Sequence, residues 1–122
     1  MARVLVAEDE NAVREFVTRA LSHAGHDVVA VADGLQALGA LSGGSYDLLV
    51  TDIVMPGMDG ISLALKATKE WPSMGLLLMT GYSAERQRAH NLEALTERVI
   101  AKPFSLTEFL GAVDAALANR LN

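Results

Sequence analysis

Short continuous apolar runs alternate along the chain with stretches in which apolar residues recur at helical spacing. The runs are RVLVA, DVVAVA, YDLLVTD, GLLLMTG and RVIA, at residues 3–7, 27–32, 46–52, 75–81 and 98–101. Runs of this length without alternation are typical of strands that are covered on both faces of a sheet. The pattern therefore predicts five buried strands.

The intervening segments predict helices, because their apolar residues fall three and four positions apart. The first expected helix begins at Asn11, has Gly25 as its C-cap, and has an apolar face made by Val13, Phe16, Val17, Ala20, Leu21 and Ala24. The second covers residues 34–44, with Leu35, Leu38 and Leu41 on one face. The third carries Ile61, Leu63, Ala64, Leu65 and Ala67 and ends near Trp71. The more polar segment 83–96 is interpreted as a fourth helix.

A fifth helix has the most regular apolar stripe, which is made by Leu106, Phe109, Leu110, Val113 and Leu117. Ser105 is expected to cap this helix, and Glu108 three residues on would complete a capping box. Five strands that alternate with five helices predict a doubly wound α/β fold with a parallel sheet, since parallel strands need crossover connections. The short connections predict one domain over residues 1–122.

Composition and charge narrow the class of protein. Of the 122 residues, 51% are hydrophobic and 20% are charged, which is a globular composition. The net charge of −5 and the scattered basic residues argue against binding to nucleic acid or an anionic membrane. The chain has no cysteine, which excludes thiolate metal sites, and no apolar run of about 20 residues. A soluble cytoplasmic protein is expected.

Polar side chains follow four of the five expected strands, at the point where each strand ends. They are Glu8, Asp9 and Glu10 after the first, Asp52 at the third, Thr80 at the fourth and Lys102 after the fifth. Ligands of open α/β sheets bind beyond the carboxyl ends of the strands. Taken alone, Asp52 could be a turn former and Asp9 could serve the positive end of a helix. Separate explanations of this kind would all have to hold for residues that meet at one crevice. We therefore favour a single functional site that these residues share.

Three converging carboxylates need protons or a cation, since like charges about 4 Å apart repel by about 4 kcal/mol at an effective dielectric constant of about 20. Oxygen ligands that are completed by water and phosphate oxygens suit Mg²⁺. A carboxylate at such a site can accept a phosphoryl group while a lysine and a hydroxyl hold the phosphoryl oxygens. The residues therefore predict phosphate chemistry.

Four motifs together resemble the receiver domains of bacterial two-component response regulators, and the resemblance extends over the whole chain. The motifs are Glu8-Asp9, TDIVMPGMDG around Asp52, Thr80, and KPF at residues 102–104. The resemblance implies a CheY-like (flavodoxin-like) sheet with strand order 2-1-3-4-5. It also implies Mg²⁺ as cofactor and a histidine kinase or histidine phosphotransfer protein as partner.

For the acidic residues, the resemblance implies distinct roles. Asp52 would be the phosphoacceptor. Asp9, Asp52 and the backbone carbonyl of Val54 would ligate Mg²⁺ directly, and Glu8 would act through a water molecule. Phosphorylation and its reversal would occur on the protein itself, so the resemblance implies a switch and not an enzyme with a separate substrate.

For the remaining site residues, the resemblance implies that Lys102 pairs with the acceptor carboxylate and that its peptide bond to Pro103 is cis. Thr80 would move to the phosphoryl oxygen, so that the signal reaches the face made by the fourth helix, fifth strand and fifth helix, which is also the expected dimer surface. Many receivers have Tyr or Phe three residues before the lysine, where this chain has Val99. Either the switch works without a rotating aromatic residue, or Tyr82 takes over part of that role.

Two other classes of function are weaker fits to the residues. An Mg²⁺-dependent aspartyl-phosphate hydrolase would carry an acid/base carboxylate where Val54 stands. A flavin-mononucleotide carrier would need a Ser/Thr/Gly-rich phosphate cradle where the sequence EDEN presents negative charge.

The motifs also resemble, more narrowly, the small stand-alone receivers related to CpdR, which control regulated proteolysis through the ClpXP protease. This resemblance rests on the segments AEDEN, TDIVMPGMDGI, MTGYS and KPFSL. Receivers attached to hybrid histidine kinases are almost as similar, so a receiver excised from a longer protein is the alternative.

Overall fold

The computed structural model describes residues 2–81 and 99–119 of the chain. Its elements are β1 (Arg3–Ala7), α1 (Asn11–His23), β2 (Asp27–Val31), α2 (Gly34–Gly43), β3 (Leu48–Asp52), α3 (Gly60–Glu70), β4 (Gly75–Thr80), β5 (Val99–Ala101) and α5 (Leu106–Ala118). These nine elements confirm the predicted ones, with boundaries that differ by one or two residues in most cases. The helix expected over residues 83–96 lies outside the described residues, as does Tyr82.

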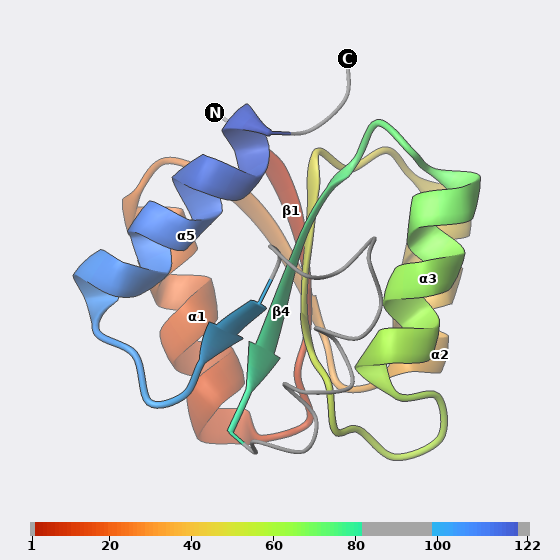
Figure 1. Cartoon of the computed structure of the whole chain (residues 1–122), viewed down its shortest axis with the longest axis horizontal. Coiled ribbons are helices and arrows are strands. Elements are labelled where there is room, and N and C mark those ends of the chain that lie inside the picture. Colours follow the sequence, from red (N-terminus) through yellow and green to blue (C-terminus); the bar gives the residue numbers. More distant parts are fainter. Residues whose placement is uncertain (1, 82–98, 120–122) are drawn as a thin grey trace.

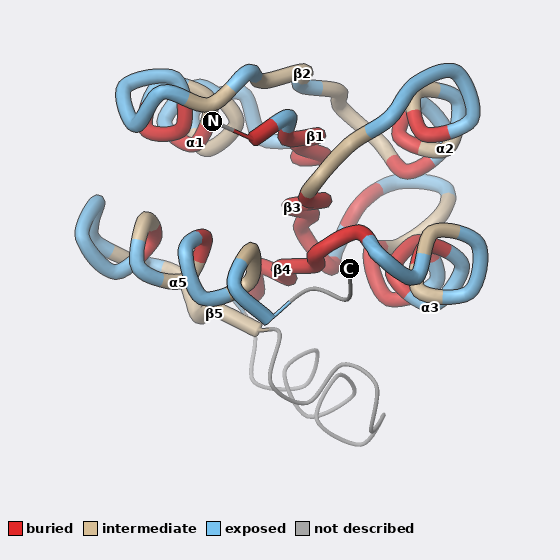
Figure 2. The backbone as a smooth tube through the Cα atoms, turned by 90° about the horizontal axis from the view of Figure 1, so that it is seen from above, coloured by how far each residue is buried: buried red, intermediate tan, exposed pale blue. Residues whose placement is uncertain are grey.

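The five strands form one parallel sheet in the order β2-β1-β3-β4-β5. Helices α1 and α5 cover one face of the sheet, and α2 and α3 cover the other (Figure 1, Figure 2). The doubly wound fold and its strand order are therefore as predicted. None of the helices described here is long and apolar enough to cross a membrane.

The unbroken apolar runs in the strands arise because neighbouring side chains enter two different cores. In β1, Val4 and Val6 pack with α1 and α5, whereas Leu5 and Ala7 pack with α2 and α3. All four residues are fully buried. Strands β3 and β4 are buried along their whole length in the same way, as Figure 2 shows in red. Burial on both faces removes the polar alternation that a half-exposed strand would have.

Side-chain caps fix the start of three of the four described helices. Asp33 accepts a hydrogen bond from the N–H of Gln36 at the start of α2, and Asp59 accepts one from the N–H of Ser62 at the start of α3. The capping box predicted for α5 is present, with both Ser105–Glu108 bonds formed. Helix α1 is the exception, because its N-cap residue Glu10 makes no such bond.

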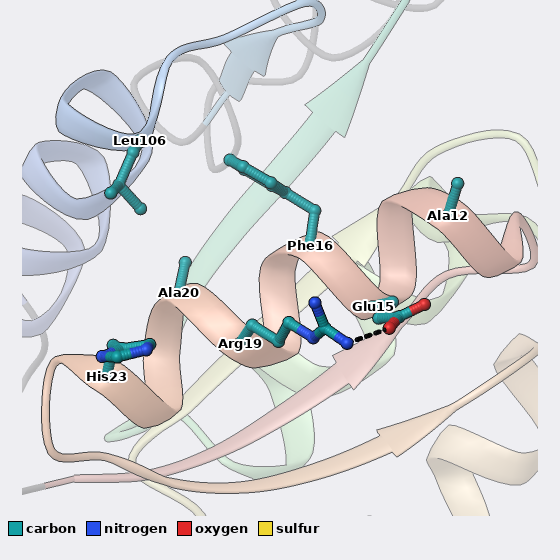
Figure 3. Close-up of a pocket in the computed structure, with 7 residues that line it drawn as sticks. All are labelled: Ala12, Glu15, Phe16, Arg19, Ala20, His23 and Leu106. Atoms are coloured by element: carbon teal, nitrogen blue, oxygen red, sulfur yellow. Dashed lines mark ion pairs between the residues drawn. The ribbon is translucent and has the colours of Figure 1, made fainter.

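Four large apolar residues that the periodicity assigned to the predicted helices are instead exposed. The exposed fractions are 41% for Phe16, 65% for Leu35, 40% for Leu65 and 50% for Leu106. The α5 stripe is buried only at Phe109 and Val113. Helical spacing shows which residues share a face but not how much of that face the sheet covers. Phe16 and Leu106 line a groove of about 440 Å³ between α1 and α5, with the Glu15–Arg19 ion pair on the α1 side (Figure 3).

Candidate functional site

The parallel sheet brings the predicted site residues to one edge, because all five strands end on the same side. Backbone bonds continue past the strand ends and hold the following residues in place. The N–H of Glu8 donates to the carbonyl of Val31 (3.1 Å), and the N–H of Lys102 donates to the carbonyl of Thr80 (2.7 Å). Glu8 and Lys102 are therefore anchored through their backbones as well as through their side chains.

Glu8, Asp9 and Asp52 form a compact acidic cluster at this edge. Each offers one carboxylate oxygen, and the three oxygens lie within 4.8 Å of one another. Glu8 is fully buried and Asp52 is 7% exposed, whereas Asp9 is exposed to solvent. The three carboxylates that the sequence predicted to converge thus do so, although Glu8 and Asp52 lie 44 residues apart in the chain (52 − 8 = 44).

Lys102 contributes the positive charge of the site. Its Nζ lies 2.9 Å from Oε1 of Glu8 and 3.3 Å from Oδ1 of Asp52. Sequence resemblance implied the contact with Asp52, and the structure adds a shorter one with Glu8. The lysine therefore bridges the two buried carboxylates, and its peptide bond to Pro103 is cis.

Burial and charge together perturb the proton affinities of these three groups. Burial raises the pKa of Glu8 above its ordinary value, against hydrogen bonds from the N–H of Glu10 and from Lys102 that lower it. Burial likewise raises the pKa of Asp52, with Lys102 as the main opposing influence. Burial opposes the charge of Lys102, but its bond to Glu8 and the charge of Asp52 outweigh this and raise the lysine pKa. Burial thus disfavours the charged forms of both carboxyls, and Lys102 partly offsets this.

The backbone around Asp52 is held by a close approach of α3. The Ile53 N–H donates both to Oδ1 of Asp52 (2.9 Å) and to the Met79 carbonyl (3.1 Å). The N–H of Gly60, the first residue of α3, donates to the Ile53 carbonyl at 2.8 Å. A Cβ atom at Gly60 would lie 2.0 Å from the carbonyl oxygen of Asp52, so only glycine permits this approach.

A solvent-accessible cleft of about 340 Å³ leads to the acidic cluster. It is lined by Asp9, Glu10, Asp52, Val54, Gly81 and Lys102. Val54 is 45% exposed and has no ionisable group. Thr80 is buried, with 1% exposure, at the end of β4 between β3 and β5. Glu10 was among the strand-end residues expected at this crevice but was given no role of its own, and Gly81, which directly follows Thr80, was not predicted.

The donor set of the cleft fits a hard divalent cation. Glu8, Asp9 and Asp52 each offer a carboxylate oxygen. Asp9 lines the solvent-accessible cleft, from which water can complete the coordination shell of an ion. Asp9, Asp52 and the Val54 carbonyl are the groups that would hold Mg²⁺ there. Such an ion would offset the repulsion between carboxylates and would supply charge stabilisation to a bound phosphoryl group.

Fold and site together define a doubly wound α/β protein with an acidic, lysine-bridged crevice at the carboxyl edge of its sheet. A model of the family described as "Response regulator receiver domain" matches residues 4–114. The chain therefore belongs to the response regulator receiver domain family, and its resemblance to that family is confirmed.

Three relatives show how far this similarity extends. The chain is 37% identical to the response regulator receiver protein CpdR of Brucella abortus, over 96% of this chain and 98% of the relative. It is 34% identical to the transcriptional regulatory protein TcrA of Mycobacterium tuberculosis, but spans only 45% of that protein's length. The response regulator TrrA of Thermotoga maritima, solved in complex with Mg²⁺-BeF, superposes with a TM-score of 0.85 at 29% identity, covering 95% of this chain and 99% of that one.

Family membership places the chain in two-component signalling. It implies histidine kinases or phosphotransfer proteins as partners and an Mg²⁺ ion at the acidic pocket. The relatives that extend beyond the match, such as TcrA and the MprA regulators, are about twice as long as this chain.

Proposed function

We propose that this chain is a phosphoacceptor switch in which Asp52 takes a phosphoryl group from a histidine kinase or histidine phosphotransfer protein. The observation that carries the proposal is the meeting of Glu8, Asp9 and Asp52 within 4.8 Å, with Lys102 in contact with two of them. The Mg²⁺-bound TrrA structure, which shares the fold, supports the assignment of the metal.

The two oxygens of Asp52 have different surroundings that suit different tasks. Oδ1 accepts the hydrogen bond of the Ile53 N–H and lies beside the ammonium group of Lys102. Oδ2 is therefore the oxygen that we expect to attack phosphorus. An oxygen–phosphorus bond forms at Oδ2 as the bond between phosphorus and the donor nitrogen or oxygen breaks, and the leaving group takes that electron pair. Lys102 is then positioned to hold a phosphoryl oxygen.

Acetyl phosphate provides a direct test, because it supplies the phosphoryl group without a partner protein. With Mg²⁺ present, the wild-type chain is expected to gain one phosphoryl group in intact-mass spectra, and Asp52→Asn is expected to gain none. The control is Asp33→Asn, since asparagine caps a helix as well as aspartate does and Asp33 lies outside the cleft. Equal labelling of wild type and Asp52→Asn would refute the proposal, as would labelling that is unaffected by chelating the metal.

The response to phosphorylation is proposed to pass through Thr80 to the strands beside it. Thr80 pairs with Ala101 in β5, and its carbonyl accepts the N–H of Lys102. Val99, which stands where many receivers have an aromatic residue, is half-buried and packs against the α2–α3 core. Phosphorylation adds about 1.5 to 2 negative charges, so a partial population shift that a partner completes is expected.

The downstream role that we propose is regulated proteolysis through ClpXP, by contact between proteins. Support comes from the end-to-end match with CpdR, which contrasts with the half-length match to the transcriptional regulators. In a pull-down with purified ClpXP, the amount of wild-type chain that is captured should differ between its phosphorylated and unphosphorylated forms. Capture of Asp52→Ala should not respond to acetyl phosphate. Capture that is independent of both variables would contradict a phosphorylation-gated output and would favour a receiver that acts within a longer protein.

A further inference from the structure

The turn between β1 and α1 carries two of the three acidic residues of the cluster and lacks the usual helix cap. Helices α2, α3 and α5 all begin with a side chain that accepts a backbone N–H, whereas Glu10 at the start of α1 does not. Asp9 lies in the middle of this turn, is exposed, and must nevertheless meet Asp52. Contacts other than a helix cap therefore hold the turn in shape, and one of them is the bond from the Glu10 N–H to Oε2 of Glu8.

Arg14, one turn into α1, makes the contacts that span it. Its Nη1 donates to the carbonyl oxygen of Glu8 at 2.9 Å, and its Nη2 donates to Oδ1 of Asn11 at 2.5 Å. Glu8 directly follows β1 and Asn11 begins α1, so the two nitrogens join the two ends of the turn. The rigid, planar guanidinium group fixes the spacing of its two acceptors, which the single ammonium of a lysine does not.

Arg14 also completes the set of contacts that immobilise Glu8. The N–H of Glu8 donates to Val31, its Oε2 accepts from the N–H of Glu10, and its Oε1 accepts from Lys102. The remaining polar group, the carbonyl, is the one that Arg14 binds. Since the peptide group of Glu8 leads directly into Asp9, holding this carbonyl also sets the direction in which the chain presents Asp9.

We infer that Arg14 is a positioning residue for the metal site: it presets the β1–α1 turn so that Asp9 meets Asp52 without itself touching the metal or the phosphoryl group. The inference rests on the proposed function, because it concerns the ion which that function requires. Residues that orient metal ligands typically account for tenfold to hundredfold in metal affinity.

Charge and positioning make opposite predictions, which allows a sharp test. Arg14→Met removes a positive charge near an acidic site, so an electrostatic role alone would make Mg²⁺ bind more tightly. Loss of positioning would instead weaken binding. Arg14→Lys keeps the charge but loses the two guanidinium nitrogens that donate to Glu8 and Asn11. A role that depends only on charge would leave the Mg²⁺ affinity of this variant unchanged.

Calorimetric titration of Mg²⁺ into the full chain measures this effect, with circular dichroism confirming that each variant is folded at the titration temperature. We expect the Kd for Mg²⁺ to rise about tenfold in both Arg14→Lys and Arg14→Met. The control is Arg19→Met on the same helix, which loses only an exposed ion pair with Glu15 and should stay within about twofold of wild type.

Unchanged affinity in both Arg14 variants, or tighter binding by Arg14→Met, would overturn the inference, as would a wild-type chain that does not take up Mg²⁺. Failure of the proposed function has a different outcome. In that case the wild type binds Mg²⁺ and the Arg14 variants bind it more weakly, but acetyl phosphate does not label Asp52.

Discussion

Replacing Gly60 with alanine is expected to destabilise the protein by about 3 kcal/mol, the upper end of the range for overpacked sites. The added Cβ would lie 2.0 Å from the Asp52 carbonyl oxygen and 2.8 Å from both the Asp52 carbonyl carbon and the Cα of Ile53. All three are backbone atoms at the end of β3 or just after it, so no side-chain rotation can relieve the overlap. Either α3 or the end of β3 must move.

Urea denaturation measures this change against a matched control. Gly39 lies inside α2 and Gly111 inside α5, and an added Cβ would meet nothing within 4 Å at either position. Gly39→Ala and Gly111→Ala should therefore stabilise the protein by about 0.5 to 1 kcal/mol each, through the higher helix propensity of alanine. A Gly60→Ala variant that gained stability as these two do would show that α3 does not approach Asp52 as closely as described.

The fold was predictable from the sequence because the strongest physical signal, burial on both faces of the sheet, acts locally. The run at residues 75–81 has Thr80 as its single polar position and is bounded by glycine, which is typical of a short strand buried on both faces. The helix faces were less predictable. Leu35 and Leu106 have helical spacing but project beyond the area that the sheet covers, which depends on tertiary packing.

The acidic cluster was predictable for a similar reason. Residues at the carboxyl ends of parallel strands share one edge, so Glu8, Asp52 and Lys102 could be brought together without coordinates. The shorter contact of Lys102 with Glu8 could not be predicted, since it depends on where the two side chains reach. Arg14 and Gly60 were missed because each acts through the backbone of another residue, and neither the type nor the spacing of these two residues marks them out.

Removing the ammonium group of Lys102 is the second large effect that we expect. In Lys102→Met the fully buried Glu8 and the nearly buried Asp52 lose the cation that lies 2.9 Å and 3.3 Å from them. Leaving buried charge uncompensated costs about 3 to 5 kcal/mol. We therefore expect a loss of this size in the free energy of unfolding in metal-free buffer, at a pH where both carboxyls are ionised in the folded protein.

The destabilisation caused by Lys102→Met should shrink as the pH falls, and the direction of this change follows from the raised carboxyl pKa values. Burial holds the pKa of Glu8 and of Asp52 above their ordinary values. In the pH window between the ordinary pKa and the raised pKa, the folded protein therefore binds more protons than the unfolded chain. Stability must then fall as pH rises through the window and recover as pH falls through it. Lys102 lowers both pKa values, so Lys102→Met widens the window upward and steepens the dependence.

Urea denaturation of wild type and Lys102→Met across this pH range, with the metal chelated, checks both the size and the sign. Lys66→Met is the matched control, because Lys66 pairs with Glu70 at 3.4 Å on an exposed helix face. Its change should stay within about 0.5 kcal/mol at every pH. The prediction is contradicted if the difference in the free energy of unfolding between wild type and Lys102→Met stays constant as the carboxyls protonate. Lys102 would then stabilise the protein by packing and not by compensating the charges of Glu8 and Asp52.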